Sequence, residues 1–259
     1  MDRQKLLDLL DRNLGLDLNI HIYDTLASTN DKLAQLIAET GAPPGTIVIA
    51  DRQTAGRGQR GRHWDSDIGG LYLSLVLAPN LPAQNVHQLT IGIVWGIACN
   101  LRQQGLPVTI KWPNDLILDG RKLGGILTET KVYQGNIQHA IVGVGINYAN
   151  PVASPAINLA PSNNYQPNYG NFPIEMLAQS TIEGIIKGYQ HCTPATIDKL
   201  LSDYLELLNA RGRAVMVNGK LGTVLGISPQ GELHIGFMTA TEMTETYLTP
   251  GTFTLGYES

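Results

Sequence analysis

The stretch PVTIKWPNDLILDGRKLGGILTET, residues 107–130, sets out short β-forming runs and the turn between them. Asp119-Gly120 is a strong signal for a two-residue hairpin turn, and another apolar run follows at residues 137–146. The pattern predicts an antiparallel meander. Polar residues then fall at strand ends or turns of one sheet, where binding sites are usually built. These residues are Lys111, Asp115, Lys122 and Asn147.

Upstream, residues 51–64 read DRQTAGRGQRGRHW, with four arginines and three glycines in fourteen positions. Arg57, Arg60 and Arg62 carry planar guanidinium groups that suit phosphate or carboxylate. Glycine leaves the backbone free to take positive φ or to approach a ligand closely. The spacing matches neither the P-loop nor the dinucleotide fingerprint, and a solvated basic loop is the alternative. The glycines concerned are Gly56, Gly58 and Gly61.

Periodicity and turn residues predict the remaining elements. After residue 213 the pattern changes to short strands joined by NG and QG turns, which is typical of a small SH3-like barrel. We therefore predict an α+β fold with domains at 1–210 and 211–259. Residues 148–172 are predicted to be irregular. Helices are expected at 3–12, between the cap residues 28–31 and Gly41, and at 84–104, 173–189 and 194–208. Strands are expected at 19–23, 46–50, 71–77, 214–217, 220–227, 232–238, 244–251 and 253–257.

Composition limits the classes of function. The 259 residues are 43% hydrophobic and 15% charged with a net charge of -4, as in a soluble globular protein. A local cluster of arginines in an acidic chain favours a small anionic ligand over an extended nucleic-acid partner. Cys99 and Cys192 lie far apart, so we expect buried thiols rather than a disulfide or zinc site. The absence of a signal-peptide or membrane-spanning pattern predicts a cytoplasmic protein.

Taken together, the motifs resemble those of the biotin protein ligases. The resemblance spans about residues 20–257 and includes STN, QTAGRGxxGRxW, LYLSL, KWPNDLxxxxRKLGGIL, GVGIN and the terminal barrel. It implies a catalytic domain like that of class II aminoacyl-tRNA synthetases, with a mixed sheet, followed by an SH3-like domain. It also implies a ligase that uses ATP and Mg²⁺ to activate biotin as biotinyl-5′-AMP. The biotin is then transferred to a lysine of the biotin carboxyl carrier protein of acetyl-CoA carboxylase.

The resemblance also implies roles for individual residues. Lys122 would bridge the biotin carboxylate and the α-phosphate, and Arg57 would orient the same pair. Asp115 would either bind Mg²⁺ or help to accept the proton of the incoming lysine. Biotin would contact Ser28, Thr29, Asn30, Gln53, Gly56, Arg57, Lys122, Gly124, Gly125 and Ile126. ATP would contact Arg57, Arg60, Arg62, Trp64, Lys111, Asn114, Asp115, Lys122 and Asn147.

Structural alternatives exist for several of these residues. Ser28 and Thr29 can simply cap the following helix. Trp64 either packs against adenine or anchors the end of the loop. Lys111 and Asn114 either form the phosphate side of the site or make a structural ion pair and turn. Gln59 stands where the family commonly has a second arginine, which predicts weaker retention of the acyl-adenylate unless Arg60, one residue later, takes over that role.

Two other functions share parts of this pattern. A lipoate or octanoate ligase has the same architecture but should lack the KWPND and GRG pair. A biotin-responsive repressor needs a DNA-binding domain, and only about twenty residues precede the first predicted strand. We therefore expect no nucleic-acid partner. A homodimer is left open.

Overall fold

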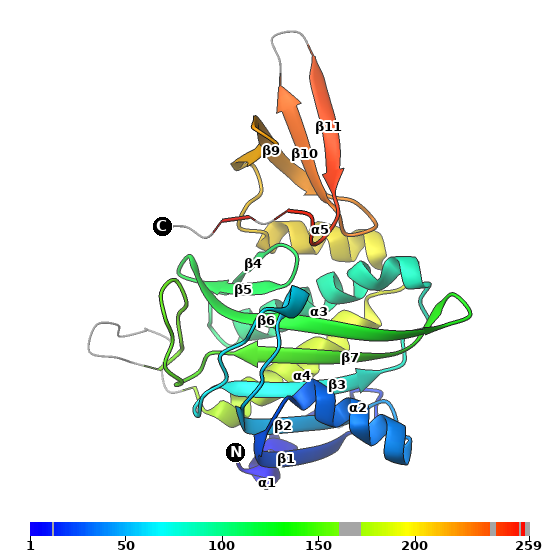
Figure 1. The fold of residues 1–259 in the computed structure, drawn as a ribbon, viewed down its shortest axis with the longest axis vertical. Coiled ribbons are helices and arrows are strands. Elements are labelled where there is room, and N and C mark those ends of the chain that lie inside the picture. Colours follow the sequence, from blue (N-terminus) through cyan, green and yellow to red (C-terminus); the bar gives the residue numbers. More distant parts are fainter. Residues whose placement is uncertain (12, 161–171, 239–241, 254, 257–259) are drawn as a thin grey trace.

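A computed structural model describes residues 1–11, 13–160, 172–238, 242–253 and 255–256. Its larger sheet has seven strands (Figure 1). The first two pair in parallel and all other neighbours are antiparallel, which confirms the predicted mixed sheet. In spatial order the strands are β1 (Asn19–Leu26), β2 (Thr46–Gln53), β3 (Leu71–Leu77), β7 (Asn136–Ile146), β6 (Arg121–Tyr133), β5 (Asp115–Leu118) and β4 (Thr109–Lys111).

The β5–β6 turn forms as predicted. Asp119 and Gly120 both have positive φ, 49° and 71°, as a type I′ turn requires. The β6–β7 register places Gly125 opposite Gly145. Because side chains alternate between faces, every second residue of β6 from Gly125 to Glu129 points to the same side of the sheet.

Helices cover both faces of this sheet (Figure 1). Behind it lie α3 (Val86–Gln103) and α4 (Ile174–Gln190), which bury the main apolar core, and α5 (Ile197–Leu207) packs against α3. On the opposite face α2 (Thr29–Thr40) covers only a small cluster. That face is therefore partly open, and it carries the cavity described below. The remaining helical elements are α1 (Arg3–Leu9), η1 (Gln59–Gly61) and η2 (Ala83–Asn85).

Glycines bring α3 and α4 unusually close together. A Cβ atom added at Gly96 would collide with the carbonyl oxygen of Gly184, and one added at Gly188 would collide with that of Gly92. The two backbones are therefore in direct contact, which only small residues permit. This pair of helices forms a rigid support behind the sheet.

The ends of α2 follow the predicted signals. Ser28 is the N-cap, and its side chain accepts a hydrogen bond from the backbone of Asp31. Gly41 ends the helix in the left-handed conformation with φ 65°. The cap places Thr29 and Asn30, both buried, at the start of the helix and beside the sheet.

The C-terminal residues form a four-stranded antiparallel sheet, consistent with the predicted SH3-like domain. Its strands are β8 (Ala214–Val217), β9 (Lys220–Ile227), β10 (Leu233–Met238) and β11 (Met243–Leu248). Phe253 makes only an isolated bridge with Pro250, so the strand predicted at 253–257 is not found among the described residues. Residues 254 and 257 lie outside them. The proposed domain boundary at 210 falls between α5 and β8 and stays a prediction.

Four smaller expectations concern the first helix, the cysteines, membrane spans and the irregular segment. The helix expected at 3–12 ends at Leu9, where Leu10 takes an extended conformation. Cys192 is buried, and burial raises the pKa of its thiol to about 12, but Cys99 is only partly buried. Among the helices described, none has the length and apolar character needed to cross a bilayer. Of the segment predicted to be irregular at 148–172, residues 148–160 belong to no helix or strand, and residues 161–171 lie outside the described residues.

Candidate functional site

The arginine-rich stretch folds into a narrow hairpin. Trp64 N–H donates to the Gly56 carbonyl at 3.0 Å, and Gly58 N–H donates to the Arg62 carbonyl at 2.8 Å. Of the three glycines, only Gly61 takes positive φ, at 70°. Gly56 is needed for space instead, because a Cβ atom there would collide with the Trp64 carbonyl and the Ser66 hydroxyl. The loop is thus a defined β-like hairpin rather than an open glycine loop.

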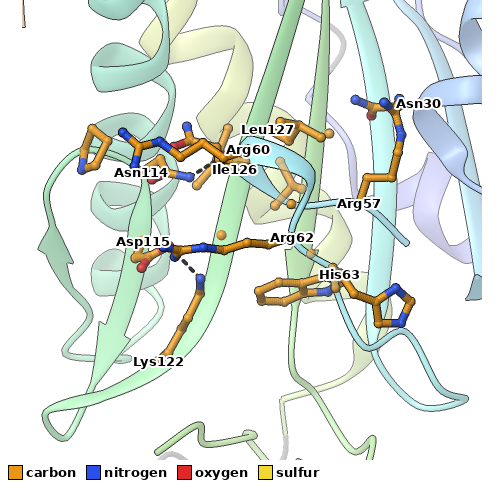
Figure 2. A pocket seen from close by; sticks show the side chains of 18 of the residues that line it. Asn30, Arg57, Arg60, Arg62, His63, Asn114, Asp115, Lys122, Ile126 and Leu127 are labelled. Carbon is orange, nitrogen blue, oxygen red and sulfur yellow. Dashed lines mark hydrogen bonds and ion pairs between the residues drawn. The ribbon is translucent and has the colours of Figure 1, made fainter. Parts of the chain in front are cut away.

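This hairpin covers a cavity of about 180 Å³ on the open face of the sheet (Figure 2). The floor comes from β6 and β7, and the start of α2 and the end of β2 form one side. Figure 2 shows Arg62 extending toward Asp115, whereas Arg57 points toward Asn30. Among the described residues that line the cavity, five are cationic and one is a carboxylate, Asp115. The cations are Arg57, Arg60, Arg62, Lys111 and Lys122.

One end of the cavity is strongly cationic. Lys122 Nζ lies 2.8 Å from Asp115 Oδ1, and Lys111 Nζ lies 3.9 Å from Asp115 Oδ2. Lys111 is 3% exposed, and burial lowers the pKa of its amine to about 8. Asp115 opposes this shift, while Lys122 and Arg62 add to it. A single carboxylate thus faces several cations, an arrangement suited to an anionic ligand.

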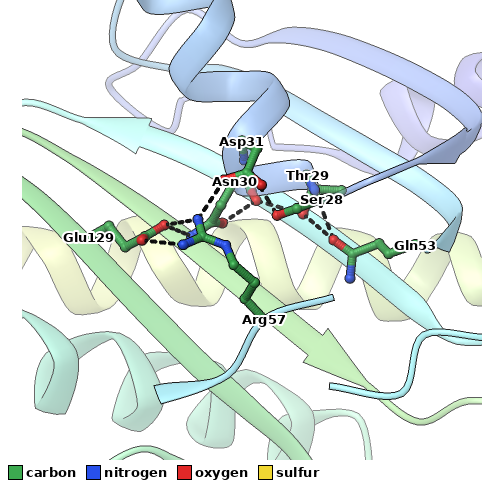
Figure 3. A network of polar contacts seen from close by, with 8 residues as sticks. Ser28, Thr29, Asn30, Asp31, Gln53, Arg57 and Glu129 are labelled. Carbon is green, nitrogen blue, oxygen red and sulfur yellow. Dashed lines mark hydrogen bonds and ion pairs between the residues drawn. The ribbon is translucent and has the colours of Figure 1, made fainter. Parts of the chain in front are cut away.

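The other end is lined by buried polar groups (Figure 3). Thr29 donates from its backbone N–H and from its hydroxyl to Gln53 Oε1, at 2.8 and 3.1 Å. Ser74 Oγ lies 2.8 Å from Thr29 Oγ1 and 2.5 Å from Asn30 Oδ1. A fixed set of donors and acceptors of this kind can orient a polar ring while apolar neighbours enclose it.

Arg57 belongs to this polar end. Its guanidinium makes two hydrogen bonds to Glu129, at 3.0 and 2.8 Å, and one to Asp31 at 2.7 Å (Figure 3). The resemblance placed Arg57 with Lys122 at the reacting groups. Both residues line the same cavity, but in this structure Arg57 is paired with two carboxylates on β6 and α2.

Two glycines of β7 leave room for the side chains above them. A Cβ atom at Gly143 would collide with the Asn30 side chain, and one at Gly145 would collide with the Trp64 indole. Trp64 therefore lies against the bare β7 backbone, and Lys122 Nζ sits 5.0 Å from its ring centroid. Among the described buried side chains, Trp64 Nε1 is the one polar atom without a hydrogen-bond partner.

Most of the predicted site residues meet at this cavity, and three do not line it. Gly56 supports the hairpin, as described above. Gly124 points to the other face of β6, toward Gly145 O and Ile146. Asn147 is buried and accepts a hydrogen bond from Asn150 at 3.1 Å, so it orders the segment after β7. The predicted residues that line the cavity are Ser28, Thr29, Asn30, Gln53, Arg57, Arg60, Arg62, Trp64, Lys111, Asn114, Asp115, Lys122, Gly125 and Ile126.

Several lining residues were not predicted. Leu127 follows from the alternation of β6, because it shares a face with Gly125. Gly143 and Gly145 lie in the GVGIN run on β7, which was linked to the site only through the family resemblance. Gly251 and Phe253 come from the chain after β11, and no local signal places them near residues 51–64. A Cβ atom at Gly251 would collide with the Arg60 guanidinium, so that side chain rests on the C-terminal segment.

The fold and the cavity define a class of proteins: a mixed α+β domain with a cation-lined cavity beneath an arginine-rich hairpin. Residues 23–147 match the model of the Biotin/lipoate A/B protein ligase family. The bifunctional ligase/repressor of Bacillus subtilis is 34% identical over 242 residues, which span 82% of this chain and 68% of that protein. The chain therefore belongs to the biotin/lipoate protein ligase family.

Other sequence relatives match shorter regions of this chain, and one solved structure matches most of it. The biotin--[acetyl-CoA-carboxylase] ligase of Paracoccus denitrificans is 36% identical over 128 residues, 47% of this chain and 51% of that protein. Against three further ligase/repressors the match spans only 39 to 41% of the relative's length. The biotin protein ligase of Aquifex aeolicus, solved with biotin and ATP, has the same fold, with a TM-score of 0.68 at 24% identity. That match covers 88% of this chain and 95% of the Aquifex chain.

Proposed function

We propose that the protein is an ATP-dependent biotin–protein ligase. The observation that carries this proposal is the cavity end at which Lys111, Lys122 and Arg62 surround the carboxylate of Asp115, beside a buried polar cluster. The Aquifex relative was solved with biotin and ATP, so we infer that the anionic ligands of this cavity are an acid and a nucleotide. The biotin carboxylate attacks the α-phosphate of ATP, pyrophosphate leaves, and biotinyl-5′-AMP forms. The amine of an acceptor lysine then attacks the acyl carbon, and AMP leaves.

The cationic end suits the first step. Two unit charges of the same sign about 4 Å apart repel by about 4 kcal/mol at an effective dielectric constant of about 20. We assign Lys122 and Lys111, with Arg62, to offset this repulsion between the carboxylate and the phosphate. Thr29 and Gln53 would orient the ureido ring of biotin at the polar end. Trp64, the predicted contact of adenine, has its ring centroid 5.0 Å from Lys122 Nζ, close to the cationic end.

Asp115 is better placed as a partner of lysine than as a metal ligand. Lys122 and Lys111 already lie near its two oxygens. Any Mg²⁺ would therefore arrive with the phosphates of ATP, which commonly supply its ligands. Asp115 would hold Lys122 in place and then receive the proton of the acceptor lysine.

The acceptor remains part of the proposal. The name of the Paracoccus relative specifies acetyl-CoA carboxylase as the protein it modifies. On that basis we infer that the acceptor here is a lysine of a biotin carboxyl carrier domain. A cytoplasmic location and a homodimer also stay predictions.

Biotin-dependent exchange of pyrophosphate into ATP tests the first step directly. We expect exchange with biotin, and we expect Lys122→Ala to lower it by about 10²- to 10³-fold, as when one donor to a developing charge is removed. Lipoate and octanoate serve as competing acids in the same assay. Exchange with either of these and not with biotin would reassign the substrate. Undiminished exchange in Lys122→Ala would remove that residue from the mechanism.

A further inference from the structure

Glu129 is the main partner of Arg57, and no role was predicted for it. Its two oxygens accept both guanidinium bonds in a bidentate pair, a geometry that is stronger and more specific than a single contact. Asp31 adds one bond to the same guanidinium. Arg57 thus meets two negative charges, and its own charge is already balanced within the protein.

These contacts continue as a chain of hydrogen bonds across the polar end of the cavity (Figure 3). Glu129 Oε2 accepts from Asn30 Nδ2 at 2.7 Å, and Asn30 Oδ1 lies 2.5 Å from Ser74 Oγ. Ser74 in turn lies 2.8 Å from Thr29 Oγ1, which leads to Gln53.

The same network of hydrogen bonds reaches the other arm of the hairpin. Gln53 Nε2 donates to Ser66 Oγ at 2.8 Å, and Ser66 Oγ donates to the Trp64 carbonyl at 2.9 Å. Arg57 lies on one arm and Trp64 on the other, so the network joins both arms to β6, α2 and β2. Breaking the network at Glu129 should free the Arg57 arm while the Trp64 arm stays attached.

We propose that Glu129 is a positioning residue that fastens residues 57–64 over the cavity through Arg57, and that Asp31 supports it. The ion pair between Arg57 and Glu129, called the latch from here on, lies beside Thr29 and Gln53, at the end assigned to the biotin ring. That assignment rests on the biotin ligase function proposed above. Lys122 and Lys111 lie beside Asp115, at the end assigned to the phosphates. The latch therefore governs retention of biotin more than binding of ATP.

Limited trypsin digestion of the 259-residue protein tests the latch without any need for activity. Arg60 and Arg62 are exposed at the tip of the hairpin, and cleavage after them reports its release. In Glu129→Gln, which keeps the size of the side chain, we expect this cleavage to be about three- to tenfold faster. Asp31→Asn should give a smaller increase, because it removes one bond rather than two. Cleavage after Arg211, in the connection to the C-terminal sheet, is the internal reference.

Asp203→Asn is the matched control, since it removes a surface pair with Lys199 at a similar distance of 2.9 Å. Cleavage of Glu129→Gln at the control rate would overturn the proposal. Arg57→Gln combined with Glu129→Gln should cleave no faster than either single variant, because both remove the same pair. Additive effects would show that the two residues act separately, and would likewise overturn it.

Pyrophosphate exchange adds the functional readout. In Glu129→Gln the KM for biotin should rise about three- to tenfold while the KM for ATP stays within about twofold of wild type. Equal increases in both values would contradict a latch at the biotin end. If the wild-type protein shows no biotin-dependent exchange, the proposed function fails, and the digestion experiment still decides whether Glu129 fastens the hairpin.

Discussion

Lys111 is a residue of the site whose charge changes with pH just above neutrality, because its pKa is lowered to about 8. Burial is the main cause of its lowered pKa, and the neighbouring Lys122 and Arg62 favour the neutral amine further, against the opposing effect of Asp115. Because the pKa is about 8, the free enzyme loses this positive charge as the pH rises through that value. Binding of an anion then weakens, since less positive charge remains to offset it.

We therefore predict that kcat/KM for ATP in pyrophosphate exchange falls above about pH 8. The slope approaches about tenfold per pH unit, because kcat/KM reports ionisation of the free enzyme. Lys111→Arg should lack this decline, since arginine keeps its proton throughout the range. A decline of the same size in Lys111→Arg would assign the pH dependence to another group.

Gln59 permits a second residue-scale prediction. It lines the cavity at the tip of the hairpin, where the family resemblance calls for arginine. An amide carries no charge to hold the phosphate of the intermediate, so we expect Gln59→Arg to release free biotinyl-adenylate more slowly than the wild type. Rapid quenching with and without an acceptor domain measures that release. Equal rates from the two proteins would refute the prediction.

At the scale of single elements, β7 depends on glycines that leave space for the hairpin. In Gly145→Ala the new Cβ atom would collide with the Trp64 indole. We expect a loss of about 1–3 kcal/mol in the free energy of unfolding, typical of overpacking. Exchange activity should fall by about tenfold to a hundredfold as the hairpin shifts. Urea denaturation and the exchange assay measure the two effects.

Gly125→Ala is the matched control for stability. A Cβ atom at Gly125 would meet its nearest neighbours at 3.4 to 3.5 Å, an ordinary contact distance. The free energy of unfolding of Gly125→Ala should therefore stay within about 0.5 kcal/mol of the wild-type value, as expected for a substitution without a steric clash. Equal losses in the two variants would show that the cost is a general one for alanine in these strands.

The elements themselves were largely predictable because their signals are local. Asp119-Gly120 specified a turn, and Ser28 and Gly41 marked the ends of α2. The pairing of Arg57 with Glu129 was not predictable, because the two residues are 72 positions apart and meet only through strand register. A slip of one residue in β6 would turn Glu129 to the other face of the sheet. The alternation of side chains along β6, counted from Gly125, could have placed Glu129 on the cavity side of the sheet. It could not have shown that Glu129 lies beside Arg57.

At the scale of the whole molecule, the C-terminal sheet is attached to the larger sheet and contributes to the cavity. The indole N–H of Trp112 donates to the Gly231 carbonyl at 2.9 Å, and Gln88 Nε2 donates to the Pro229 carbonyl at 2.5 Å. Gly251 and Phe253 then complete the cavity wall. The sequence predicted both sheets, but contacts between them depend on packing over more than a hundred residues. Local patterns carry no signal for such contacts.

Trp112→Phe tests this attachment. Trp112 is 2% exposed, and phenylalanine keeps most of its apolar volume but has no donor for the Gly231 carbonyl. Leaving a buried acceptor unsatisfied costs about 1–3 kcal/mol, and we expect the free energy of unfolding from urea denaturation to fall by that amount. Tyr189→Phe is the control, because it removes a single aromatic donor from the Ala78 carbonyl at an exposed position. That variant should lose less than about 0.5 kcal/mol.

Because Trp112 also lines the cavity, Trp112→Phe should raise the KM for ATP as the wall formed by Gly251 and Phe253 loosens. A variant as stable as wild type, with unchanged KM, would show that the two sheets are held together by other contacts.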